Sequence, residues 1–184
     1  MKKLLFILTI TGFVFAYQGD IKTQAQESFD KAMVILQTQS DLSKATDEIF
    51  SFLENEFNME LMARFSLGKH YETLNESQKT TYMQAFKKLL KKDFISKIEF
   101  YKNEKITITD VATQNNRGYI TAILNYQGAD RNIILSIAKS KNSDNWFVYD
   151  IKVDDISLIS TYKTQFANLY IENDFNTFID KISQ

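Results

Sequence analysis

The feature that most constrains the fold is a change in the spacing of apolar residues just after Asn103. Before this point, large apolar side chains recur every three or four residues, as on one face of an amphipathic helix. From about residue 105 to residue 153 they alternate with polar residues, as in a β-strand, and helical spacing returns beyond residue 157. The sequence therefore predicts an α+β domain whose helices precede and follow a sheet.

The helical segments carry local signals for where they begin and end. Asn58 and Gly68 suit the N-cap and the C-terminal stop of a short helix. Asn75 followed by Gln78 resembles a capping box that opens the longest helix. The predicted helices cover residues 21–36, a segment around 49–57, and residues 59–67, 76–101, 157–170 and 174–182.

The central segment predicts four strands joined by short turns, covering residues 105–111, 117–127, 131–139 and 146–153. Short loops between successive strands favour antiparallel pairing. Both faces of several strands carry bulky apolar side chains, so either both faces are covered or one face lines a cavity. We expect coverage of both faces. In the last strand, alternation assigns one face to Phe147, Tyr149, Ile151 and Val153 and the other face to Trp146 and Val148.

The N-terminus predicts export from the cytoplasm. Lys2 and Lys3 precede an apolar run that ends at Phe15, and Ala16 then offers a small residue at a cleavage position. The run is shorter than the roughly 20 apolar residues of a membrane-spanning helix, which argues against the alternative of an uncleaved anchor. We expect residues 1–16 to be a signal peptide and residues 17–184 to form a single domain.

The composition excludes several classes of function. The chain has no Cys and one His, so it offers neither a thiol nucleophile nor the ligand set of a zinc site. No nucleophile-elbow pattern accompanies His70, and no glycine-rich phosphate loop is present. A net charge of −1 argues against nucleic acid as a partner. We therefore expect no catalytic residue, no metal and no cofactor.

Several segments resemble one family. Residues 57–71 read FNMELMARFSLGKHY and resemble the FD-x-x-x-MAR-x-x-LG-x-x-W signature of MlaC, the toluene-tolerance family of periplasmic phospholipid carriers. Residues 75–90, 146–159 and 161–166 resemble the helix, the strand-to-helix segment and the NYR-x-QF motif that follow in that family. The chain departs from the usual family residues at Asn58, Tyr71, Asp155 and Lys163.

The resemblance implies a four-stranded antiparallel curved sheet, packed with helices that precede and follow it, around an apolar lipid cavity. It also implies a non-enzymatic periplasmic carrier of a lipid-asymmetry pathway, which shuttles glycerophospholipid between the outer and inner membranes. The bound phospholipid would be cargo rather than a cofactor. The implied protein partners are an inner-membrane ABC transporter, met through its membrane-anchored substrate-binding subunit, and an outer-membrane lipoprotein–porin complex.

Two alternatives remain open at this point. The first is an exported α+β domain like ketosteroid isomerase that binds or converts a small apolar ligand. Its acid–base pair would be Asp150 with Tyr149 or Tyr126, although Asp150 and Tyr149 are poor partners because neighbouring residues of a strand face opposite ways. The second alternative is an adaptor protein with a solid core, which would carry no lipid.

The residues predicted to line the lipid cavity are apolar side chains of the helices before the sheet and of the strands. Each of them could instead belong to an ordinary core. We also expect Arg64 to be a structural charge paired with a carboxylate such as Asp150. The predicted lining residues are Met62, Phe65, Phe86, Leu90, Phe94, Ile98, Ile108, Ile120, Ala122, Leu124, Ile133, Leu135, Phe147, Tyr149 and Ile151.

Overall fold

A computed structural model describes residues 19–98 and 104–183 of the chain. The predicted signal peptide and the predicted helix end at Tyr101 lie outside the described residues. The elements are α1 (Ile21–Thr38), α2 (Leu42–Leu53), η1 (Glu54–Glu56), α3 (Met59–Leu67), η2 (Gly68–Thr73), α4 (Glu76–Ile98), β1 (Lys105–Gln114), β2 (Arg117–Tyr126), β3 (Ala129–Lys139), β4 (Trp146–Val153), β5 (Ile156–Ser157), α5 (Leu158–Glu172) and α6 (Phe175–Ser183).

The strands form one antiparallel sheet in the order β1-β2-β3-β4-β5, so the α+β class and the antiparallel meander are confirmed. The prediction of four strands is wrong, because the short strand β5 pairs Val153 with Ile156. The reversal between them passes through Asp154 and Asp155, whose φ angles are 47° and 67°. Aspartate adopts this left-handed conformation more readily than most residues, but no glycine marks the turn in the sequence.

The helix ends form as their side chains predict. Asn58 Oδ1 accepts a hydrogen bond from the Leu61 N–H at 2.9 Å, and α3 stops at Gly68, whose φ is +60°. At the start of α4, Asn75 Oδ1 accepts from the Gln78 N–H while Gln78 Oε1 accepts from the Asn75 N–H. These bonds satisfy N–H groups that have no partner inside the helix.

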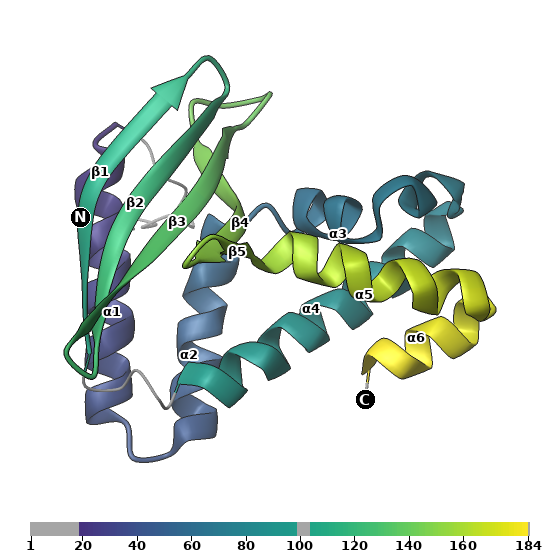
Figure 1. The fold of residues 1–184 in the computed structure, drawn as a ribbon, viewed down its shortest axis with the longest axis horizontal. Helices are drawn as coiled ribbons and strands as arrows, with labels where there is room; N and C mark the ends of the chain where they lie inside the picture. Colours follow the sequence, from purple (N-terminus) through teal and green to yellow (C-terminus); the bar gives the residue numbers. More distant parts are fainter. Residues whose placement is uncertain (1–18, 99–103, 184) are drawn as a thin grey trace, which may run out of the picture.

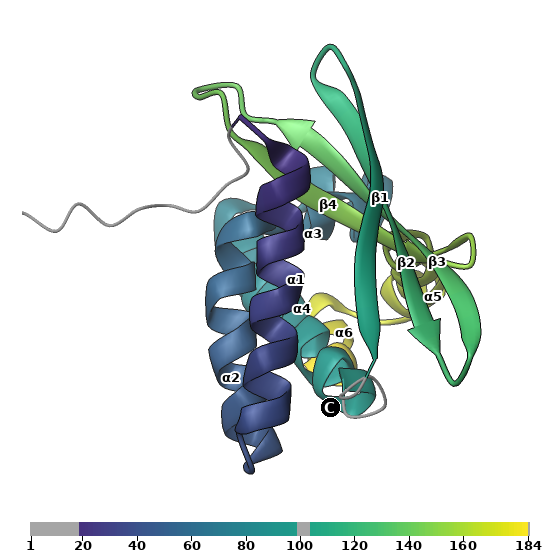
Figure 2. The same cartoon turned by 90° about the vertical axis from the view of Figure 1, so that its left-hand side faces the viewer.

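The helices form two groups around the sheet. Helices α1 and α2 run side by side, with α1 packed against β1 (Figure 2). Beyond β4, helices α3, α4, α5 and α6 form a second group (Figure 1). That group has an aromatic core of fully buried rings, centred on Tyr82, Phe86, Phe166 and Phe178. None of the described helices has the length and apolar character that a membrane span requires.

The face of the sheet toward α1 is buried, whereas the opposite face is buried on β3, at Ser136 and Ala138, but not on β2, so the expected coverage of both faces holds only in part. On β2, Ile120, Ala122 and Leu124 are buried on the side of α1, whereas Tyr119 is 49% exposed on the opposite face. The unburied face tolerates exposure because an antiparallel sheet needs only one packed face.

A β-bulge in β4 overturns the predicted alternation of its side chains. Ser136 pairs with Asp150 and Ile137 pairs with Val148, so Tyr149 has no opposite residue. An extra residue in one strand moves the side chains that follow it to the opposite face of the sheet from the one that simple alternation predicts. Val148 and Ile151, which alternation assigned to opposite faces, consequently border the same pocket, and Tyr149 does not.

Candidate binding site

An apolar pocket of about 290 Å³ lies where the two helix groups meet the sheet. Helix α1 forms one wall with Phe29, Ala32, Met33 and Leu36. The buried face of the sheet forms the opposite wall, and the remaining wall comes from α2, η1, α3, α4 and the start of α5. Aliphatic, methionine and phenylalanine side chains dominate the lining, so the pocket suits flexible apolar ligands that need no directional contact.

The four polar side chains that border the apolar pocket bond to one another in pairs. Ser28 Oγ on α1 donates to Glu56 Oε1 on η1, where Glu56 is 5% exposed. Tyr162 on α5 donates to Asp93 Oδ2 on α4. Each bond connects two different elements of the pocket lining. Satisfied pairs of this kind keep polar groups in an apolar lining without the cost of an unpaired buried group.

Burial also keeps the Tyr162 phenol neutral. Desolvation, together with the hydrogen bond to Asp93 and its negative charge, raises the pKa of Tyr162 far above its ordinary value of 10.0. Tyr162 therefore remains a hydrogen-bond donor at any physiological pH and adds no charge to the pocket wall.

Helix α1 is attached to the sheet through the open edge of β1. Gln26 Nε2 donates to the Ile106 carbonyl at 3.0 Å, and Gln26 Oε1 accepts from the Ile108 N–H at 2.8 Å. Lys22 Nζ donates to the Thr109 carbonyl of the same edge. The amide of Gln26 therefore supplies the pair of bonds that a neighbouring strand would form, which protects this edge from pairing with another chain.

The structure brings many of the predicted lining residues together at the apolar pocket and separates the others. Phe86 lies in the aromatic core of the second helix group, and Ile108, Ile120 and Ala122 lie in the core beneath the sheet. Phe147 is half-buried and does not border the apolar pocket. The side chain of Ile98 lies outside what the structure describes. The predicted residues that border the apolar pocket are Met62, Leu90, Phe94, Leu124, Ile133, Leu135 and Ile151.

Sequence reasoning missed the wall formed by α1. The helical spacing of Phe29, Ala32, Met33 and Leu36 was visible, but it indicates only that one face of α1 is buried. The spacing does not distinguish a face packed in a core from one that borders a pocket. Val148 was missed because the bulge at Tyr149 was not foreseen.

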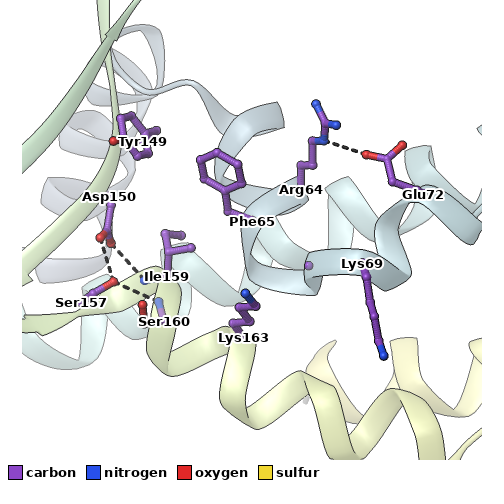
Figure 3. Close-up of a pocket in the computed structure, with 11 residues that line it drawn as sticks. Arg64, Phe65, Lys69, Glu72, Tyr149, Asp150, Ser157, Ile159, Ser160 and Lys163 are labelled. Carbon is purple, nitrogen blue, oxygen red and sulfur yellow. Dashed lines mark hydrogen bonds and ion pairs between the residues drawn. The ribbon is translucent and has the colours of Figure 1, made fainter. Parts of the chain in front are cut away.

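A second, more polar pocket of about 480 Å³ lies on the other side of α3, β4 and α5 (Figure 3). Phe65 and Tyr149, which we predicted for the lipid cavity, border this pocket instead and pack edge to face with ring centroids 5.7 Å apart. Its charged side chains are Arg64, Lys69, Glu72, Asp150 and Lys163.

Arg64 pairs with a carboxylate, as predicted, but the partner is Glu72 and not the suggested Asp150. Arg64 Nε forms an ion pair with Glu72 at 2.7 Å. Asp150, which is 8% exposed, accepts hydrogen bonds from Ser157 Oγ at 2.7 Å and from the Ile159 N–H at 3.1 Å. Asp150 therefore holds the first turn of α5 on β4, at a helix N-terminus where a negative charge is favourable. Among the described residues, no cluster of His, Asp and Glu side chains could hold a metal ion.

Comparisons with known proteins agree with this architecture. The family model described as MlaC protein matches residues 26–184. Among the seven matching chains of solved structures is a phospholipid-binding protein from Ralstonia solanacearum in complex with a phospholipid. It superposes with a TM-score of 0.78 at 17% sequence identity, over 89% of this chain and 95% of that chain. This similarity shows a shared fold. The comparison with curated proteins found no match.

Proposed function

We propose that this chain, which belongs to the MlaC family, is a non-enzymatic periplasmic carrier of glycerophospholipid. The observation that carries the proposal is the apolar pocket between α1, the sheet and the second helix group, whose few polar side chains bond to one another. Such a lining accepts acyl chains and offers nothing to a charged headgroup, which would remain near solvent. The Ralstonia protein of the same fold holds a phospholipid, which supports the assignment.

The energetics of lipid transfer explain why a carrier needs such a pocket. Removing one methylene from water is worth ~0.8 kcal/mol, so two chains of about fifteen methylenes total roughly 25 kcal/mol. Free diffusion of single lipids between membranes is therefore negligible. A protein that replaces water with apolar side chains along part of the chains lowers this barrier without any covalent step.

We propose that the walls of the pocket separate when lipid enters, because the pocket is small for such a ligand. Its volume of about 290 Å³ lies just below the ~300–1,000 Å³ of pockets that hold drug-sized ligands, and a diacyl lipid is larger than these ligands. The Gln26 bonds to β1 and the Ser28 bond to Glu56 connect α1 to the other walls and would exchange with water as the pocket opens. Hydrogen bonds exchanged for water cost little, which suits a reversible change.

The family and the predicted signal peptide support a place for this carrier in the periplasm. We propose that it moves glycerophospholipid between the outer and inner membranes. Its partners would be an ABC transporter, met through the transporter's membrane-anchored substrate-binding subunit, and an outer-membrane lipoprotein–porin complex. A ketosteroid-isomerase-like enzyme is less well supported, because its candidate base Asp150 holds the start of α5 and does not border the apolar pocket.

Lipid transfer between vesicles tests the proposal. Purified protein is mixed with donor vesicles that carry a fluorescent phospholipid and with unlabelled acceptor vesicles, and the rate of transfer is measured. Leu124→Arg, which places a charge in the pocket, should abolish transfer, whereas Ile123→Arg on the opposite face of β2 should retain it. Circular dichroism verifies that both variants fold. Equal transfer by Leu124→Arg and the unaltered protein would contradict lipid binding in this pocket.

A further inference from the structure

The polar pocket is separate from the apolar one, although the two share three elements. On α5, Leu158 and Tyr162 face the apolar pocket, whereas Ile159, Ser160 and Lys163 face the polar one. The side chains of β4 and α3 are also divided between the two pockets. Neighbouring side chains point to opposite sides because of the bulge in β4 and the helical turn of α3. A ligand in the polar pocket would therefore meet a surface that the lipid does not use.

Lys163 is the cation that the polar pocket presents. Figure 3 shows its ammonium directed from α5 toward Phe65, whereas the ammonium of Lys69 points away from the pocket. The stem of Lys163 lies against Gly68, where a β-carbon would come within 3.1 Å of Lys163 Cε. A glycine at this position therefore allows the stem to pack on the backbone of η2, which limits the directions that the ammonium can take.

The carboxylates of the polar pocket are already engaged. Glu72 pairs with Arg64, and Asp150 accepts bonds from Ser157 and from the Ile159 N–H. No ion pair joins Lys163 to a described carboxylate. A further positive charge lies close by, since the Arg117 guanidinium is 4.9 Å from the Tyr149 ring centroid. The pocket thus offers an unneutralised cation beside aromatic walls, on a chain whose net charge is −1.

We propose that the polar pocket binds an acidic segment of a partner protein, in which one carboxylate meets Lys163 and a neighbouring apolar side chain packs on Phe65 and Tyr149. Charge complementarity with the pocket supports this occupant. A phosphate group fits less well. The N–H groups of Ile159 and Ser160 at the start of α5 are already bonded to Asp150 and Ser157, so a phosphate, which needs several donors, would find few.

Binding of a model peptide, followed by ¹H–¹⁵N NMR on the whole protein, tests the proposal. The probe is a blocked tripeptide of leucine, glutamate and phenylalanine, and its glutamine counterpart is the neutral control. We expect the acidic peptide to shift the amide signals of Gly68, Ser160 and Lys163. Lys163→Met should weaken binding about fivefold, the range of an exposed ion pair. Lys163→Arg should retain binding, and Lys88→Met, on the exposed face of α4, should leave it unchanged.

Four results would overturn the proposal. The first is equal binding of the acidic and neutral peptides, and the second is an equal loss in Lys163→Met and Lys88→Met. The third is inorganic phosphate binding as tightly as the acidic peptide, which would identify a general anion site. The absence of any shift also counts against the proposal. None of these outcomes depends on lipid, so they leave the proposed carrier function to its own test.

Discussion

Filling the apolar pocket from α1 should remove lipid without unfolding the protein. Ala32 is 8% exposed and borders the pocket. A cavity of about 150 Å³ holds a benzene molecule, so the ring introduced by Ala32→Phe would take up roughly half of the 290 Å³. Occupying an apolar void is worth up to ~24 cal/mol per Å³, so we expect the free energy of unfolding to stay constant or to rise by about 1–3 kcal/mol.

The same ring should weaken lipid binding strongly. It displaces about six methylenes of an acyl chain, and at ~0.8 kcal/mol each the loss is roughly 5 kcal/mol, or more than a thousandfold in affinity. The assay is the amount of lipid that co-purifies with the protein, measured by extraction, together with a urea unfolding curve. Val34→Phe is the matched control, because Val34 is on the same helix but 56% exposed.

Two results would refute this reasoning. If Ala32→Phe keeps its full lipid load, α1 does not form a wall of the lipid site. If it unfolds while Val34→Phe is stable, the position belongs to a packed core without usable space.

Three further predictions concern stability. Gln26→Ala removes both bonds to the β1 edge and should lower the free energy of unfolding, measured in urea, by about 1–3 kcal/mol. An unchanged urea midpoint of unfolding would mean that water fully replaces the two hydrogen bonds of the amide. Asp150→Ala removes the hydrogen bonds that Ser157 and the Ile159 N–H donate to Asp150 at the start of α5. It should lower the free energy of unfolding by about 1–3 kcal/mol in the same assay. An unchanged free energy would show that Asp150 has no structural role. Burial raises the pKa of Tyr82 well above its ordinary 10.0, against the opposing hydrogen bond with Ser66, so the unfolded chain loses this proton first. The contribution of Tyr82 to the free energy of unfolding should be complete below pH 10.0 and decrease above it. Tyr82→Phe should make the free energy of unfolding less dependent on alkaline pH. The same pH dependence in both proteins would contradict the role of Tyr82.

The sequence predicts the elements of this fold well, because their signals are local. The caps at Asn58 and Asn75 and the stop at Gly68 depend on residues a few positions away, and the structure has them where the sequence indicates. The antiparallel order follows from short turns for the same reason.

The details that depend on pairing between distant segments could not be predicted. The bulge at Tyr149 arises from the register of β4 against β3. Simple alternation along β4 therefore assigns the residues on the two sides of Tyr149 to the wrong faces relative to each other. The ion pair of Arg64 with Glu72 depends on how η2 folds back after Gly68. The apolar composition of the pocket was foreseeable, whereas the choice between core and lining at positions such as Phe86 and Phe94 depends on small differences in packing. Lipid contact at the predicted residues stays a prediction.

The most direct test of the carrier function is native mass spectrometry on the protein purified from a periplasm without detergent. We expect a mass excess that matches glycerophospholipid and disappears in Ala32→Phe. A protein that carries no lipid and takes up none from phospholipid vesicles would contradict the carrier function.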